Sequence, residues 1–184
     1  MKFYEQKIHG VWIIEPEPFA DERGMFRRHF DQTEFTAHGI APAVTQCSIS
    51  ENTHRHTLRG FHYQREPFGE AKTLSCLKGS IYNVVVDLRP VSPSFRQWLA
   101  VELSAANRKS LHVPAGCANA FLTLENDSLI HYYCAESYHP EAGAGIRYND
   151  PQFEFFWPAK PAFISEKDRN WPDFVTNNNQ ERRL

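Results

Sequence analysis

Short apolar runs separated by tight turns are the feature that most constrains how this chain can fold. The clearest run, residues 81–88, alternates two sets of side chains, as a half-buried β-strand does. The segments between such runs are short and carry Pro, Gly, Asn or Asp, which favour turns. Many short strands with tight turns predict an all-β fold, an antiparallel jelly-roll barrel or sandwich. The sequence lacks the alternating strand and helix patterns of a Rossmann fold.

The remaining segments predict further strands and two short helices. Asp31 is placed to cap a helix over residues 31–38, with Glu34 at the third helical position and Gly39 just after the end. From about residue 146 the chain becomes rich in Pro and Trp, which predicts a packed tail on a single domain of residues 1–184. Ser165 is expected to cap a short helix near residues 165–169 in this tail. Strands are expected at residues 9–17, 44–50, 57–64, 72–78, 81–88, 97–103, 110–113, 118–125 and 129–137.

Composition excludes several classes of protein. With 184 residues, 41% hydrophobic and 23% charged, the chain can bury a core and is not expected to be disordered. A net charge of −2 predicts no nucleic-acid surface. No apolar stretch approaches the ~20 residues of a membrane span, and the N-terminus does not resemble a secretion signal. The four cysteines form no CxxC pair, which indicates free thiols and a cytoplasmic protein.

The first group of chemically active residues lies in residues 57–64. A His and an Arg in a half-buried strand are costly unless they meet partners or line a cavity. Two interpretations remain open here: His62 transfers protons and Arg59 binds an anion, or both are ordinary residues at the rim of a strand. Strict alternation puts Arg59 and His62 on opposite faces of the strand. A site that uses both therefore requires a bulge near Gly60 that shifts the register.

The second group, residues 111–121, resembles the second half of a cupin motif, the signature of small jelly-roll barrels. Metal-binding cupins carry a His at the position of Asn119. They also carry an upstream His-x-His and an acid, which here would be His54, His56 and Glu66. An amide is a poor ligand for transition metals, so no metal is expected. His54 and His56 are instead assigned to a solvated loop.

Several motifs then follow one another along nearly the whole chain. They are Asp21-Glu22-Arg23-Gly24, Leu58-Arg59-Gly60-Phe61-His62-Tyr63-Gln64, Lys72, Val86-Asp87-Leu88-Arg89, Val113-Pro114-x-Gly116 and Ser165-x-Lys167-Asp168. In this order they resemble the dTDP-4-dehydrorhamnose 3,5-epimerase family, the RmlC-like cupins. The resemblance implies a metal-free barrel, usually a homodimer, that uses no cofactor. It also implies an isomerase of surface-polysaccharide biosynthesis that inverts C3, C5 or both in a nucleotide-linked 4-keto-6-deoxy sugar.

The resemblance further implies a role for individual residues. His62 is expected to be the base, with Asp168 as its charge partner and Tyr132 as the acid on the opposite face of the sugar. Lys72 is expected to supply positive charge near the enolate oxygen, an interaction that is stronger in a water-poor site. The predicted substrate-binding residues are Arg23, Arg28, Gln46, Ser48, Arg59, Asn83, Asn119, Tyr138 and Lys167. Of these, Arg23 is expected to contact the nucleotide diphosphate, often from a neighbouring subunit.

Some positions depart from the family pattern. Asn83 and Asn119 stand where many members carry an Asp and a His, which removes charge but keeps polar groups. Ser137 and Met25 stand where aromatic rings hold thymine, and Arg28 replaces an acid. These departures leave open a CDP- or GDP-linked substrate and an epimerase that inverts one centre only. They also leave open a cupin that binds nucleotide sugars without catalysis.

Overall fold

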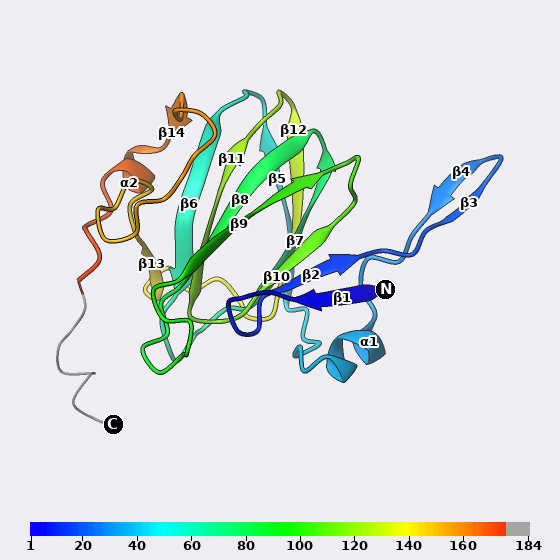
Figure 1. The fold of residues 1–184 in the computed structure, drawn as a ribbon, viewed down its shortest axis with the longest axis horizontal. Helices are drawn as coiled ribbons and strands as arrows, with labels where there is room; N and C mark the ends of the chain where they lie inside the picture. The colour runs from blue at the N-terminus through cyan, green and yellow to red at the C-terminus, as the bar shows by residue number, and fades with distance from the viewer. Residues whose placement is uncertain (176–184) are drawn as a thin grey trace.

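Two antiparallel β-sheets face each other in the computed structural model, which describes residues 1–175 (Figure 1). The first sheet has the order β1-β2-β10-β7-β12-β5, and the second has the order β13-β6-β11-β8-β9, with β14 parallel to β6. The first sheet contains β1 (Lys2–Glu5), β2 (Trp12–Glu15), β5 (Gln46–Asn52), β7 (Lys72–Lys78), β10 (Ser110–Val113) and β12 (Ser128–Cys134). The second contains β6 (Thr57–Gln64), β8 (Ser80–Asp87), β9 (Trp98–Ser104), β11 (Cys117–Thr123), β13 (Gly143–Gly145) and β14 (Phe163–Ile164). This arrangement confirms the predicted all-β jelly roll.

The alternation of side chains along each strand produces two apolar layers. Inward-facing residues such as Leu74, Val85 and Phe121 fill the space between the two sheets. The outward-facing residues of the second sheet, among them Phe61 and Val84, are covered by the chain after residue 146. The tail is therefore packed on β6, β8 and β11, and this packing fixes the position of the later part of the tail, including residues 165–169. The predicted domain continues to residue 184, and its residues 176–184 lie outside the described part.

Local sequence signals agree well with the observed elements. The strands β6, β7 and β10 have the predicted bounds. Helix α1 (Gln32–Ala37) is capped by Asp31, whose side chain accepts the backbone N–H groups of Thr33 and Glu34, as predicted. The strand predicted over residues 9–17 is shorter, because a turn around Gly10 precedes β2. Strands β1, β3, β4, β13 and β14 are not predicted, since runs of two to four residues show too little alternation.

A two-stranded ribbon extends away from the barrel (Figure 1). It consists of β3 (Phe19–Asp21) and β4 (Gly24–Phe26), which within residues 1–175 pair only with each other. Phe19 and Phe26 are 76% and 70% exposed. An isolated two-stranded ribbon is marginally stable at best, so this segment needs further contacts to hold its shape.

None of the helices in residues 1–175 is long and apolar enough to span a membrane.

A buried histidine makes the stability of the fold depend on pH. The side chain of His112 on β10 is 6% exposed, and its Nδ1 lies 2.9 Å from the Thr73 hydroxyl. Burial lowers the pKa of His112 from 6.5 to about 4. Below pH 6.5 the unfolded chain binds a proton that the folded chain does not, so stability falls as the pH decreases towards 4. The free energy of unfolding that is lost once the pH has fallen below 4 amounts to about 3 kcal/mol.

We expect the His112→Gln variant to lose less unfolding free energy than the parent protein between pH 7 and pH 5. Urea denaturation at both pH values measures this. The partly buried His29 and His131 also have lowered pKa values because of burial, so some pH dependence remains in the variant. An unchanged pH dependence would show that His112 is not responsible.

Candidate active site

The side chains of His62 and Asp168 meet where the tail packs on the barrel. His62 Nε2 lies 2.6 Å from Asp168 Oδ1, although the two residues are 106 positions apart. Asp168 lies in helix α2 (Glu166–Arg169), which Ser165 caps as predicted, and is 4% exposed. Its Oδ2 accepts the backbone N–H of Gly60 at 3.2 Å. The carboxylate is thus anchored to the strand that carries His62.

The ionisation of Asp168 decides which nitrogen of His62 is free. Burial by itself raises the pKa of Asp168, but contacts with His62, Gly60 and Ser165 outweigh it and hold the pKa below its usual value. An ionised carboxylate can only accept a hydrogen bond, so Nε2 of His62 donates. In a neutral ring, Nδ1 then carries a lone pair and is available as a base.

A β-bulge brings Arg59 and His62 to the same face of β6. The register with β11 pairs Phe121 with Arg59 and Asn119 with His62, so β6 contains one extra residue between these pairs. The bulge predicted near Gly60 is therefore confirmed. Gly60 has a φ of +112°, and a Cβ atom there would lie 2.5 Å from the Asn119 carbonyl oxygen. Only glycine fits this close approach without displacing β11.

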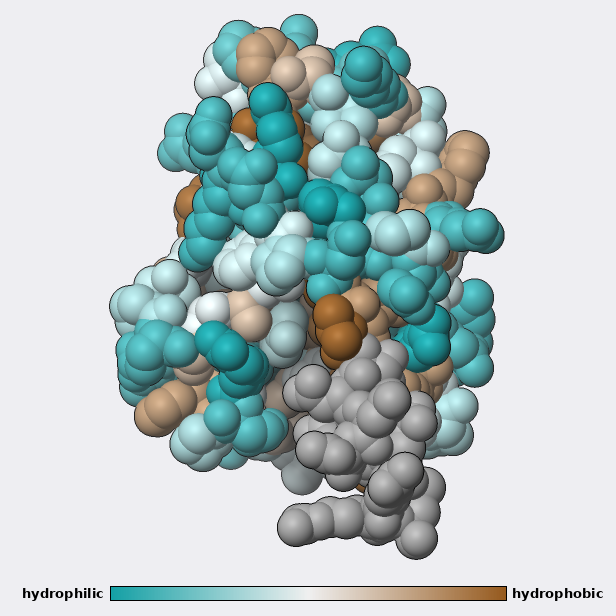
Figure 2. Space-filling view, turned by 90° about the vertical axis from the view of Figure 1, so that its left-hand side faces the viewer, coloured by the Kyte–Doolittle hydropathy of each residue, from teal (hydrophilic) through white to brown (hydrophobic). Residues whose placement is uncertain are grey.

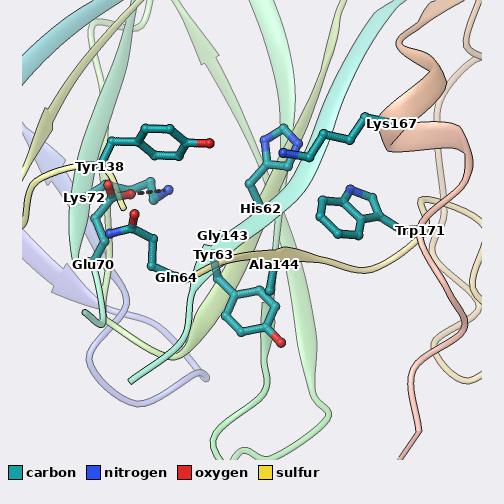
Figure 3. A pocket seen from close by; sticks show the side chains of 10 residues that line it. All are labelled: His62, Tyr63, Gln64, Glu70, Lys72, Tyr138, Gly143, Ala144, Lys167 and Trp171. Carbon is teal, nitrogen blue, oxygen red and sulfur yellow. Dashed lines mark ion pairs between the residues drawn. The ribbon is translucent and has the colours of Figure 1, made fainter. Parts of the chain in front are cut away.

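A cavity of about 270 Å³ opens beside His62 (Figure 3). Lys167 and Trp171 lie on one side of it and Tyr138, Lys72 and Glu70 on the other. The Lys167 ammonium lies 5.3 Å from the centre of the Trp171 ring. The remaining lining residues are Tyr63, Gln64, Gly143 and Ala144. The volume is of the order needed for a sugar ring, and the lining offers both proton-transfer groups and cations.

Six residues of this cavity were not predicted as site residues, and Glu70 and Trp171 are the two with the clearest chemical character. Glu70 Oε1 lies 2.6 Å from Lys72 Nζ, and the two side chains are 9% and 12% exposed. The available signal was an acid two residues before Lys72, which an extended chain places on the same side. Nothing in the sequence around Trp171 indicates that it lies at the cavity. Its indole packs on Gly145, where a Cβ would lie 2.3 Å from the ring.

Gln64 fixes the loops around the cavity. Its side-chain amide donates to the carbonyl oxygens of Phe68 and Ser137 at 3.0 Å, and its oxygen accepts the N–H of His139 at 2.6 Å. These contacts hold the loop that carries Tyr138. Gln46 contributes from β5, where its side-chain oxygen accepts the N–H of Tyr138 at 2.7 Å. Ser48 follows on the same strand, opposite Tyr132.

Tyr132 comes from the sheet opposite His62. It pairs with Leu74 on β7 and packs against the core between the sheets, so its side chain points to the barrel interior. Burial raises the pKa of Tyr132 strongly, and the charge of Arg59 offsets only part of this. The phenol therefore stays protonated at neutral pH. Tyr132 is not among the residues that line the 270 Å³ cavity.

A second cavity of about 600 Å³ adjoins the first and shares His62 and Lys167 with it. Arg59, Lys167 and Arg169 give it a basic wall suited to an anion. Arg59 is held by the side-chain oxygen of Asn52 at 2.8 Å. This side of the molecule carries β14 and α2, and its upper part is mainly hydrophilic (Figure 2).

Six of the predicted binding residues line neither cavity: Gln46 and Ser48, described above, and Arg23, Arg28, Asn83 and Asn119. Asn83 is completely buried in the barrel, and its side-chain oxygen accepts a hydrogen bond from the Asn119 amide at 2.8 Å. Arg23 pairs with Asp21 in the exposed ribbon. Arg28 pairs with Asp31, 3.2 Å away at the start of α1. Figure 1 shows the ribbon on the side of the barrel away from α2, so Arg23 does not reach His62 of its own chain.

The histidines considered as metal ligands lie elsewhere. His54 stacks on Phe163, with ring centroids 4.5 Å apart. Within residues 1–175, no three His, Cys, Asp or Glu side chains are grouped so that they could hold a metal ion.

Comparison with known proteins shows what the chain as a whole is similar to. A family described as dTDP-4-dehydrorhamnose 3,5-epimerase matches residues 5–176. An enzyme of that name from Methanothermobacter thermautotrophicus is 39% identical over 179 residues, 96% of each chain. The crystal structure of the Bacillus anthracis enzyme, with TDP and PPi bound, has a TM-score of 0.91 at 33% identity, covering 94% of this chain and 99% of that one.

Two further solved structures contain sugar nucleotides. The Legionella pneumophila enzyme, in complex with dTDP-4-keto-L-rhamnose, has a TM-score of 0.85 at 35% identity and covers 91% of this chain and 89% of its own. ChmJ from Streptomyces bikiniensis, a 3'-monoepimerase in complex with dTDP-quinovose, has a TM-score of 0.85 at 33% identity, with coverages of 91% and 85%.

Proposed function

The chain belongs to the dTDP-4-dehydrorhamnose 3,5-epimerase family, and on that premise we propose that it inverts C3, C5 or both in a dTDP-linked 4-keto-6-deoxyhexose. It is a nucleotide-sugar epimerase, an isomerase of deoxysugar biosynthesis. The observation that carries the assignment of its site is the 2.6 Å contact between His62 and a buried, ionised Asp168 at the edge of a sugar-sized cavity.

The proposed reaction is proton transfer next to the ketone. His62 Nδ1 takes a proton from the carbon beside C4, and the electron pair of the broken C–H bond moves onto the ketone to form an enolate. The Lys72 ammonium stabilises the negative oxygen. Tyr132, from the opposite sheet, returns a proton to the other face of the same carbon and so inverts it. A positioned base of this kind contributes about 10²- to 10⁴-fold to the rate.

Inversion of a single carbon is the second candidate, and the neutral Asn83–Asn119 pair supports it. Asn119 pairs with His62 across β11 and β6 and stands where the resemblance places a His, so its neutral amide cannot supply positive charge to a second enolate. The likeness to a 3'-monoepimerase is consistent with this reading.

Heavy-water exchange tests the function and the base together. We expect the protein to incorporate deuterium next to the ketone of the dTDP-linked 4-keto-6-deoxyglucose, and NMR counts the deuterons and locates them. The CDP-, GDP- and UDP-linked sugars are tested for comparison. Ser137 and Met25 stand where the resemblance places the aromatic rings that hold thymine, so the preferred base has to be measured. Binding without exchange for all four sugars would instead support a non-catalytic cupin.

A homodimer is also part of the proposal, with Arg23 of each subunit at the diphosphate of its partner's substrate. Phe19 and Phe26 are exposed, and in the described residues 1–175 the ribbon pairs with no other strand; both observations favour such a contact. In a mixture of the His62→Ala and Arg23→Ala variants, each mixed dimer contains one site with both residues intact. We expect exchange of subunits to restore roughly a quarter of the parent activity. No recovery, or a monomer by light scattering, would contradict the shared site.

We further propose a cytoplasmic location. The free thiols of Cys47, Cys76, Cys117 and Cys134 support it, since disulfides are rare in reducing compartments.

A further inference from the structure

A buried ion pair forms the cavity wall near Tyr138. The Lys72 ammonium and the Glu70 carboxylate are in direct contact there (dashed line in Figure 3), and both side chains are almost fully removed from water. Lys72 begins β7 and pairs with Val113 of β10 and Cys134 of β12, so its backbone is fixed between two strands. Its four-carbon side chain is flexible, and only contacts at the ammonium can fix where Nζ lies.

Glu70 is the group that makes this contact. Removing a lysine from water costs several kcal/mol unless an opposite charge and hydrogen bonds compensate. The neighbouring Cys134 does not compensate, because burial and the charge of Glu70 raise its pKa to about 11 and keep it neutral at pH 7. The other basic side chains of the cavity have different partners, since His62 contacts Asp168 and Lys167 lies over Trp171.

We infer that Glu70 is a positioning residue that holds the Lys72 ammonium at the cavity wall, ready for the oxygen that becomes negative during the reaction. The inference rests on the proposed epimerase function. Before the substrate binds, the Lys72–Glu70 ion pair carries no net charge, so a neutral ketone can enter the cavity without facing an isolated buried cation. The enolate then forms beside an ammonium that is already in place, which avoids the cost of moving it during the reaction.

This arrangement predicts a loss in kcat with little change in KM. The Glu70→Gln variant keeps the shape of the side chain but removes its charge, so the ammonium is free to move toward other acceptors such as the substrate diphosphate. We expect kcat to fall about tenfold or more and KM to change by less than about threefold. The Glu70→Asp variant keeps the charge on a shorter side chain and should recover part of the lost kcat.

A double-mutant cycle isolates the action of Glu70 through Lys72. In a Lys72→Met background, Glu70→Gln should lower kcat by less than about twofold, because no ammonium remains to be positioned. The control is Glu15→Gln, which breaks the 2.9 Å Lys109–Glu15 ion pair outside the cavity and should leave kcat unchanged. Circular dichroism checks that each variant is folded.

Three results would overturn the inference. One is parent-like kcat in Glu70→Gln, another is a Glu70→Asp variant no better than Glu70→Gln, and the third is losses that multiply in the double variant. All three require a parent protein that exchanges deuterium. A parent protein that exchanges none with any keto sugar would instead contradict the proposed function.

Discussion

The Asp168→Asn variant is expected to lose about 10²- to 10⁴-fold in kcat while it remains folded. Asparagine matches aspartate in shape, but its amide can donate a hydrogen bond as well as accept one. A donated hydrogen bond to Nε2 would place the ring proton on Nδ1. The nitrogen facing the substrate would then have no lone pair, and the proposed base would be lost.

The measurement is the rate of deuterium uptake into the keto sugar, followed by NMR. His62→Ala should abolish uptake, and adding Asp168→Asn to it should cause no further loss, because the two residues act as a unit. Asp173→Asn is the matched control, since Asp173 also lies in the tail but pairs with Arg147. Uptake by Asp168→Asn within about threefold of the parent would remove Asp168 from the mechanism.

The Gly60→Ala variant is expected to lose about 2–5 kcal/mol of unfolding free energy, together with most of its activity. Gly60 has a φ of +112°, which alanine rarely adopts, and an added Cβ would meet backbone atoms of Asn119 and Ala120 at 2.5 and 2.7 Å. These atoms belong to β11, the centre of the second sheet, and they cannot move without breaking its hydrogen bonds. Relief of the contact would distort the bulge that turns His62 inward.

Urea denaturation gives the loss in stability, and the exchange assay gives the loss in activity. Gly39→Ala separates the two contributions, because Gly39 also has a positive φ of +71° but no atom within 4 Å of an added Cβ. It should cost only about 1–2 kcal/mol. Equal losses in the two variants would mean that the contact with β11 is unimportant.

The parts of the fold that were predictable are those that local patterns specify. Strands β6, β7 and β10 have the expected bounds, and Asp31 and Ser165 cap the two helices as expected. The short strands were missed because a few residues contain no measurable alternation. Glu70 and Trp171 were missed because an acid and an aromatic ring become site residues only once the fold brings them to the cavity of His62.

The jelly-roll class, the turns and caps, and the family could be read from the sequence. Alternation and capping depend on neighbouring residues, and the order of the motifs is visible along the chain without knowledge of the fold. The sequence also required a bulge near Gly60 if Arg59 and His62 were to share a site. The bulge itself, and the contact that the resemblance implied between Asp168 and His62, are seen only in the folded chain. A one-residue shift in register reverses the face of every side chain that follows, and a contact across 106 residues depends on how the tail packs.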